Sequence, residues 1–422
     1  MSISFLYHTQ HIQGFKHQRF IYSGDSVIQI IKRKKFRCRH CNSSNVLKSF
    51  LRTKDIHGLK SGSKKHYFRV DVHRIYCPKC RKREVEEFSF LSHSKARITK
   101  AFERSLIELR GEMSIKAISE YYDVDWRTVK KLEKVHLTKK FARIPLSHVT
   151  TIGIDEIHVH KKADKVNGKD KFITVVRDLI SGTVLFVGQG KSSETLAPFQ
   201  KKLKRAGTQL EFIAIDMSAA FTSWAKNNYP DALIIYDHFH VIKRMNKAVN
   251  DVRKRVCSEL NKPEEGESKK DKEIRIEKSK GLKGKRFLVL YGEERLDNDK
   301  KKDLQILREN YKDLGDATLI KEELRSIYRC NDAHVAESKL KHLIDTAKET
   351  GVKELIKVAE SIENHFDGIL AFWHSNRITS AAMEGFNNKI RWLIRQAYGF
   401  HDEEYFHLKI FDLPTLKTAK EL

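Results

Sequence analysis

Three acidic side chains lie where they can hold divalent cations: Asp155 in TIGIDEIHVH, Asp216 in EFIAIDMS and Glu384 in AAMEGFNNKIR. The first two lie in or at the end of apolar runs typical of β-strands, and the third lies in a helical pattern far downstream. Carboxylates spaced in this way can hold two cations of the Mg²⁺ class about 4 Å apart, which together bind the attacking and leaving oxygens of a phosphodiester. One aspartate after a strand is usually a turn residue, but three acids in this order favour a metal site.

The elements that must position these acids begin after Pro145. A Ser181-Gly182 turn between apolar strands predicts a hairpin, and the later strands alternate with helices, which predicts parallel pairing. Three antiparallel strands followed by this alternation are the strand order of the RNase H-like fold, in which the first and fourth strands are neighbours. The predicted strands are Thr151–His160, Phe172–Leu179, Val184–Gly188, Phe212–Asp216 and Ala232–Tyr236, and the predicted helices are Ser192–Ala206, Ala219–Asn228 and Val241–Leu260.

Further side chains lie close to these acids in the predicted sheet. Asp237 and His240 form a DxxH pair at the start of a helix. Asp237 can cap that helix, and His240 is either a buried histidine or a catalytic group beside the acids. Glu156 points to the opposite side of the strand from Asp155, so an outward-facing or substrate-contacting role is more plausible for it than metal ligation.

Four of the six cysteines form two CxxC pairs, Cys38/Cys41 in FRCRHCNSS and Cys77/Cys80 in IYCPKCRKR. Two residues between thiolates make a turn that aims both sulfurs at one tetrahedral Zn²⁺, so the pairs predict a zinc ribbon. A strand over KKHYFRVDVHRIY and a hairpin loop around His57–Lys65 would join them. Disulfides and a redox pair are the less favoured alternatives. His40, His57 and His73 are interpreted as surface or nucleic-acid contacts rather than as ligands.

A helix-turn-helix is predicted after the cysteines. A helix containing Phe102 and Leu106 precedes the short helix SIKAISEYY, and Asp125 is placed to cap a third helix whose Val129 and Leu132 face inward. The opposite face carries the predicted DNA contacts, Arg127, Thr128, Lys130, Lys131 and Lys134. Any pair of helices with a solvated lysine face has this pattern, but the charge of the segment favours DNA.

The charge of the chain, +27 over 422 residues, is concentrated at one end. Residues 1–150 carry 33 Lys and Arg against 13 Asp and Glu, a net charge of +20, and the other 272 residues carry +7. Such a segment is expected to bind a polyanion, DNA or RNA. No apolar run is long enough to span a bilayer and no signal peptide is evident, so a cytoplasmic protein without a membrane partner is expected.

The predicted organisation is multidomain α/β. A charged, strand-free stretch separates the last strand from the helix of Glu384, and we interpret it as an all-helical insertion into the RNase H-like domain. The predicted domains are a zinc ribbon over 1–92, a helix-turn-helix over 93–145, the first catalytic part over 146–260, the insertion over 261–365 and the second catalytic part over 366–422.

Four segments together resemble the ISL3 family of bacterial insertion-sequence transposases: GIDEIHVHKK, IDMSAAF, YDHFHVIKRMNKAVNDVRK and AMEGFNNKIRWLIRQAYGF. The resemblance runs along nearly the whole chain, including the cysteine pairs and the helix-turn-helix. It implies a DDE catalytic triad, carried here by Asp155, Asp216 and Glu384, and a catalytic domain split by an insertion. It also implies that the DxxH pair follows the second acid, as in related transposases.

The implied function is DNA transposition, in which terminal inverted repeats are bound and DNA is cleaved and joined with Mg²⁺ or Mn²⁺. The expected partners are double-stranded DNA, both repeat and target, and a second copy of the chain, since two ends must be held. Asn388 and Lys389, one turn after Glu384, are predicted DNA contacts. A bacterial cytoplasmic, nucleoid-associated location follows. The alternatives are another RNase H-like nuclease, such as a junction resolvase, and a regulator that binds DNA without cutting it.

Overall fold

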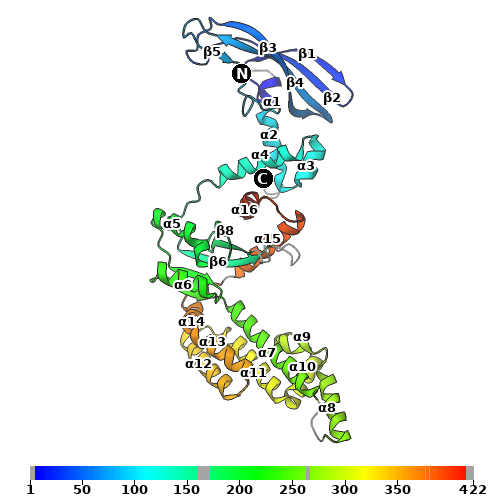
Figure 1. Ribbon diagram of the computed structural model, residues 1–422, viewed down its shortest axis with the longest axis vertical. Coiled ribbons are helices and arrows are strands. Elements are labelled where there is room, and N and C mark those ends of the chain that lie inside the picture. Colours follow the sequence, from blue (N-terminus) through cyan, green and yellow to red (C-terminus); the bar gives the residue numbers. More distant parts are fainter. Residues whose placement is uncertain (1–4, 160–171, 263–266, 376, 380, 415–422) are drawn as a thin grey trace. The chain divides into compact units, whose positions relative to one another are not determined.

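The computed structural model describes residues 5–159, 172–262, 267–375, 377–379 and 381–414, which are traced in Figure 1. These residues fall into two compact units, 5–142 and 143–414. The first unit holds both cysteine pairs and the predicted helix-turn-helix, and the second holds the three acids. His160, the last residue of a predicted strand, lies outside the described residues.

The first unit is built on a twisted sheet with the order β1-β2-β4-β3, to which the short β5 adds on β4. β2 pairs with β4 in parallel, and the other pairs are antiparallel. Alternate residues of β4 are buried, including Phe68, Val70 and Val72, and they form one apolar core. The strands are β1 (Phe15–Ser23), β2 (Ser26–Arg33), β3 (Leu47–Ser61), β4 (Lys64–Tyr76) and β5 (Arg83–Val85), after a short helix α1 (Phe5–Gln10).

The loop predicted around His57–Lys65 is wrong for most of its length, because β3 runs to Ser61 and the turn is confined to Gly62 and Ser63. Gly62 has φ of +63°, which glycine adopts without strain. The segment looks like a loop because it contains glycines and serines. Pairing with β4 from Leu47↔Tyr76 to Ser61↔Lys64 nevertheless keeps it extended.

His57 joins the sheet to the helices that follow, and its interpretation as a surface contact is wrong. It is 6% exposed. Its backbone N–H donates to the carbonyl of Arg97 at 2.8 Å and its carbonyl accepts from the N–H of Thr99 at 2.9 Å. Its ring stacks on Tyr67, with centroids 4.6 Å apart, and lies 4.6 Å from the ring of Phe102. His57 therefore packs the sheet against the first helix of the helix-turn-helix.

Burial makes this junction sensitive to acid. It lowers the pKa of His57 from 6.5 to about 4, so the folded state resists protonation that the unfolded chain accepts. The stability that His57 contributes is therefore present above pH 6.5 and is lost as the pH falls towards 4, by up to about 3 kcal/mol. We expect His57→Phe, which keeps the ring packing, to reduce the pH dependence of hydrogen exchange in β3 and β4, after correction for intrinsic rates; the part that remains is assigned to His66 of β4, whose pKa burial also lowers to about 4. An unchanged slope would contradict this assignment.

The helix-turn-helix is present as predicted. Asp125 caps the last helix by accepting from the N–H of Arg127 at 2.7 Å. Val129 is buried and Leu132 packs on the same small core. Of the five predicted contact residues, Arg127 and Lys131 are exposed, and Thr128, Lys130 and Lys134 are partly exposed. The helices are α2 (Lys100–Glu108), α3 (Ile115–Tyr122) and α4 (Trp126–Lys140).

The second unit contains a five-stranded sheet with the order β10-β9-β6-β7-β8. β6, β7 and β8 are antiparallel, and β9 and β10 continue the sheet in parallel from β6, so the predicted neighbours are confirmed. The Ser181-Gly182 turn is also present, with φ of +74° at Gly182. The strands are β6 (Thr151–His158), β7 (Phe172–Asp178), β8 (Val184–Gln189), β9 (Phe212–Ile215) and β10 (Leu233–Tyr236).

Helices pack on both faces of this sheet. One face, with Ile152 and Ile154 of β6, shares a core with α5 (Ala197–Ala206), α6 (Ala219–Asn228) and α7 (His238–Leu260). The opposite face, with Ile157 of β6, packs on α15 (Ala381–Gln396) and α16 (Glu403–Asp412). Consecutive residues of β6 therefore face different helices, which decides what surrounds each acid.

Between α7 and α15 the described residues form helices and no strand. These helices extend the core of α7, and α14 packs on β10 at the edge of the sheet. They are α8 (Lys269–Leu282), α9 (Arg286–Leu290), α10 (Asn298–Asn310), α11 (Lys312–Ile327), α12 (Ala333–Glu349), α13 (Lys353–Asn364) and α14 (Phe366–His374). Within the described ranges, none of the helices combines the length and apolar character that crossing a membrane requires.

Candidate functional site

Asp155 and Asp216 lie level with each other on neighbouring parallel strands. The register of β6 and β9 pairs Thr151 with Phe212 and Gly153 with Ala214. Continuing it by two residues places Asp155 opposite Asp216, which directly follows β9. Both side chains are partly exposed. The prediction that the two acids are brought together across 61 residues of sequence therefore agrees with the strand register.

Both oxygens of Asp155 are held by hydrogen bonds. Oδ1 accepts from the backbone N–H of Glu156 at 2.8 Å, and Oδ2 accepts from Nδ2 of Asn387. Burial raises the pKa of Asp155, and the nearby charge of His240 acts in the opposite direction. Each carboxylate oxygen has two lone pairs, so each retains acceptor capacity. Asp216 accepts from the N–H of Ser218 at 3.0 Å.

Glu156 faces the other side of β6 but takes part in the same electrostatic cluster. Burial raises its pKa first, and the charge of Asp216 raises it further, while Lys191 lowers it. The side chain is partly buried. An outward-facing or substrate-contacting role for Glu156 therefore stays a prediction.

Glu384 lies in the first turn of α15 and is exposed. Among the described residues, its carboxylate does not form a cluster with Asp155 and Asp216 in which all ligand oxygens lie within 4.8 Å of one another. The contact between α15 and Asp155 is made instead by Asn387, one turn after Glu384. The predicted DNA contacts Asn388 and Lys389 are exposed, and Asn388 accepts a hydrogen bond from Arg391 at 2.8 Å.

Asn387 carries a signal in the sequence, its place on an apolar helix face. Met383, Phe386 and Ile390 form the buried stripe of α15, and Asn387 falls on that stripe, four residues after Met383 and three before Ile390. A polar residue on an apolar stripe needs a partner in the core. Asn387 is 3% exposed, and its partner is Asp155.

Two residues bring α15 close to the sheet. Gly153 leaves room for the helix, because a Cβ there would lie 3.0 Å from Cγ of Met383 and 2.7 Å from the side chain of Leu179. Arg177, buried on β7, donates from Nη1 to the carbonyl of Ala382 at 2.7 Å. Its guanidinium also lies over the ring of Phe386 at 4.2 Å. Sequence spacing gave no sign of Arg177, because its partner is 205 residues away.

We expect Arg177→Met to destabilise the second unit by about 2–4 kcal/mol, because the carbonyls of Ala382 and Gly182 lose their buried charged donor. Hydrogen exchange in the first turns of α15 should increase more than exchange in α6. Arg205→Met, at an exposed position on α5, is the control and should change stability by less than about 0.5 kcal/mol. Equal effects of the two substitutions would show that Arg177 does not hold α15.

The DxxH pair caps α7 as predicted. Asp237, which is 2% exposed, accepts from the N–H of Phe239 at 3.3 Å. Nε2 of His240 lies 4.0 Å from Oδ2 of Asp237. The charge of His240 lowers the pKa values of Asp155 and Glu156, so the imidazole is within electrostatic range of the acids. A protonated His240 would therefore favour their ionised forms.

In the first unit, Cys38, Cys41, Cys77 and Cys80 form a cluster in which all sulfurs lie within 4.8 Å of one another. The two pairs have matching turns: Asn42 donates to the carbonyl of Cys38 and Arg81 to that of Cys77, and both donors have positive φ. A backbone hydrogen bond from Cys80 lowers the pKa of Cys77 to about 7. Four thiols in two such turns suit a tetrahedral Zn²⁺, and none of the four is in a disulfide.

A basic groove lies across the first residues of β3, the last residues of β4, and β5, which flank the cysteine pairs in sequence. Its volume is about 710 Å³. Lys48, Arg74 and Arg83 line it and are exposed. The acid of the groove, Glu84, is already engaged by the backbone N–H of Arg39 at 3.0 Å. With three cations against one acid among its lining residues, the groove offers positive charge to an anionic ligand.

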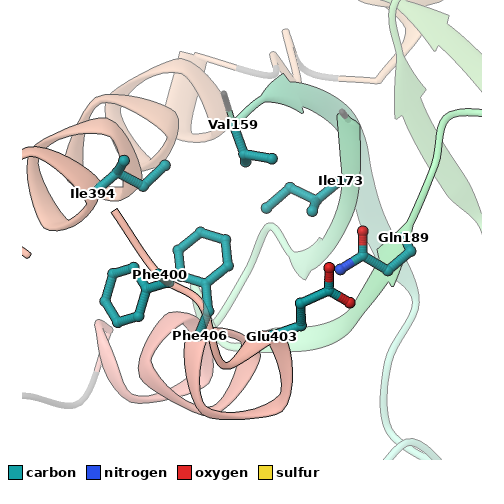
Figure 2. A pocket seen from close by; sticks show the side chains of 7 residues that line it. All are labelled: Val159, Ile173, Gln189, Ile394, Phe400, Glu403 and Phe406. Atoms are coloured by element: carbon teal, nitrogen blue, oxygen red, sulfur yellow. The ribbon is translucent and has the colours of Figure 1, made fainter. Parts of the chain in front are cut away.

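A small apolar recess lies between the sheet and α15–α16, and Figure 2 shows the side chains around it. Its volume of about 20 Å³ is enough for roughly one water molecule, so it is too small to be a substrate site. The lining residues are Val159, Ile173, Gln189, Ile394, Phe400, Glu403 and Phe406.

The chain is similar in its sequence both to family models and to individual known proteins. Residues 152–410 match the DDE_Tnp_ISL3 family, described as "Transposase", and residues 94–132 match the "Helix-turn-helix domain of transposase family ISL3". The chain is similar to the transposase for insertion sequence element IS1001 of Bordetella parapertussis, with 28% identity over 81% of each chain. It is also similar to the transposase for IS1557 of Mycobacterium tuberculosis, with 25% identity over 72% of this chain and 69% of that protein. A Drosophila P element transposase strand transfer complex aligns with a TM-score of 0.37 and 10% identity, over 76% of this chain and 92% of that one.

Proposed function

The chain belongs to transposase family ISL3, and on that basis we propose that it binds the ends of an insertion sequence and catalyses cation-dependent cleavage and strand transfer. The observation that carries the proposal is the register of β6 and β9, which sets Asp155 level with Asp216. Two carboxylates on adjacent strands repel each other, and a divalent cation between them removes that cost.

The donors around this pair suit Mg²⁺ or Mn²⁺. Asp155 and Asp216 supply hard carboxylate oxygens, and each oxygen of Asp155 already holds one hydrogen bond that fixes its orientation. Glu384 is the proposed third acid. It lies one turn from Asn387 on α15, so the helix that reaches Asp155 presents Glu384 on nearly the same side.

When bound, such cations lower the pKa of an attacking water or 3′-hydroxyl and neutralise charge on the leaving oxygen. The chain itself then has to orient the carboxylates and the DNA. Asp155, Asp216 and Glu384 hold the site, and His240, whose Nε2 lies 4.0 Å from Oδ2 of Asp237, is proposed to act at its edge. No covalent enzyme intermediate is needed.

The catalytic sheet is proposed to be RNase H-like. Three antiparallel strands followed by two parallel strands on the side of the first strand support this assignment. In the proposal, α8–α13 are an insertion between the part of the domain that holds Asp155 and Asp216 and the part that holds Glu384.

The first unit is proposed to hold the DNA ends. Its helix-turn-helix presents Arg127 and Lys131 on an exposed face of α4. The groove of Lys48, Arg74 and Arg83 provides a second cationic surface, suited to backbone phosphates. We propose that Zn²⁺ on the four cysteines fixes the edge of this groove, because β5 follows Cys80 directly. The place of action would be the bacterial cytoplasm, at the nucleoid, with at least two copies holding two ends.

The test is a reaction of the zinc-loaded protein on DNA carrying the ends of the element, with Mg²⁺, with Mn²⁺ and with neither cation added. Joined products that require a cation support the proposal. Cleavage without joining would point to an RNase H-like nuclease instead. Tight binding without cleavage under any condition would point to a regulator.

A further inference from the structure

Asn387 is a polar side chain built into the apolar contact between α15 and β6. It is 3% exposed and lies on the helix stripe of Met383, Phe386 and Ile390. Nδ2 donates to Oδ2 of Asp155, across 232 residues of sequence. A buried amide at this position is therefore directed at one of the proposed cation ligands.

The chemistry of the pair fixes which end of the amide makes the contact. An ionised carboxylate can only accept hydrogen bonds, so the amide nitrogen faces Asp155. Oδ1 of Asn387 is then left without a hydrogen-bond partner among the described residues, although it is buried. Buried polar atoms are rarely left in that state, and an unpaired oxygen beside the carboxylate of Asp155 calls for an ion or a water.

Asp155 is restrained on both sides. Oδ2 takes the bond from Asn387, and Oδ1 takes the bond from the N–H of Glu156 at 2.8 Å. The two bonds fix the plane of the carboxylate while leaving a lone pair on each oxygen. An amide oxygen is a hard donor of the kind that Mg²⁺ and Mn²⁺ accept.

We propose that Asn387 is a positioning residue of the cation site, which orients Asp155 through Nδ2 and adds Oδ1 as an oxygen ligand. The inference rests on the proposed function only in requiring a divalent cation at Asp155. It assigns α15 a second role beside carrying Glu384, namely docking onto the carboxylate of β6.

The test is Mn²⁺ binding to the zinc-loaded full chain, followed by electron paramagnetic resonance, with Asp155→Asn defining the background. Asn387→Leu keeps the size of the side chain and fills an apolar stripe, so the fold should be retained. We expect it to weaken Mn²⁺ binding by roughly 10–100-fold, the range seen when groups that orient metal ligands are removed. Binding within twofold of the wild type, or no Asp155-dependent binding in the wild type, would overturn the proposal.

Asn387→Asp is a second variant, nearly isosteric with the wild type, and it tests the proposal even if the fold does not accept leucine at position 387. It sets two carboxylates against each other, so we expect the zinc-loaded variant to have a lower melting temperature without added Mn²⁺ and a larger rise on adding Mn²⁺ than the wild type. The same Mn²⁺-induced rise in both proteins would overturn the proposal, because it would show that position 387 does not face the cation.

DNA joining measured in parallel separates the proposed role of Asn387 from the proposed function of the chain. If the wild type joins DNA with Mn²⁺ and Asn387→Leu needs no more Mn²⁺ to do so, the role of Asn387 is refuted and the proposed function stands. If the wild type binds Mn²⁺ through Asp155 but joins no DNA, the proposed function fails, and the Mn²⁺ affinities of the variants still decide the role of Asn387.

Discussion

Replacing Asp216 with asparagine is expected to reduce strand transfer by about 10³-fold or more while leaving DNA binding unchanged. Charge stabilisation by a bound cation contributes several kcal/mol to the transition state, and each 1.4 kcal/mol is a factor of ten. The fold should persist, because the asparagine oxygen can accept from the N–H of Ser218 as Asp216 does. Two quantities are measured: the amount of joined product formed per hour, and the binding of labelled DNA that carries the ends of the element.

Asp231→Asn is the matched control. Asp231 is exposed in the turn before β10, so the same loss of one charge from the same unit should leave joining within about twofold. Asp216→Cys distinguishes a ligand from a merely nearby charge, because a thiolate is a poor ligand for Mg²⁺ and a better one for softer ions. We expect partial activity of that variant with Mn²⁺ and none with Mg²⁺. A rate of joining by Asp216→Asn within tenfold of the wild type would show that Asp216 is not a cation ligand.

Loss of zinc is expected to have the second large effect. The binding energy of a structural Zn²⁺ is about 10–16 kcal/mol in small zinc-binding peptides, and it stabilises only the folded form of the two CxxC turns. Cys80→Ser removes one of four sulfurs that lie within 4.8 Å of one another. We expect its bound zinc to fall from one ion per chain to well below one, and its affinity for end DNA to fall at least tenfold.

The unfolding should be local. The core of Phe68, Val70 and Val72 is formed by the sheet and contains none of the four cysteines, so it can persist without them. Hydrogen exchange should increase over residues 34–46 and 77–85 and remain slow in β2. Cys257→Ser, at a thiol outside the cluster, should keep both zinc and DNA binding. Global unfolding of Cys80→Ser, or full zinc retention, would contradict this account.

The strands of the second unit were predictable because each is a short apolar run bounded by turn residues. β6 is buried on both faces over Thr151–Ile154, which gives a continuous run and not an alternating one. The same logic failed for the C-terminal half of β3. There Gly58 and Ser61 resemble a loop, and extended structure is imposed by β4, which the local sequence does not show.

The site was predictable in part for the same reason. Asp155 and Asp216 could be paired because strand order follows from the pattern of elements. Arg177 and Asn387 could not be paired with their partners by spacing, since those contacts depend on how α15 lies on the sheet. The place of Glu384 relative to the other acids remains a prediction, and so do the DNA contacts of Arg127, Lys131 and Lys389.

The long stretch of sequence between the first unit and α15 has a consequence for synthesis on the ribosome. The first unit ends near residue 142, and α15 follows about 240 residues later. At about 5–20 residues per second, roughly 10–50 s separate the two, and domains fold in order of emergence. A nascent chain therefore completes its basic DNA-binding surface well before α15 can dock on Asp155. Under the proposed function, the nascent chain binds DNA during that interval before it is able to cut it.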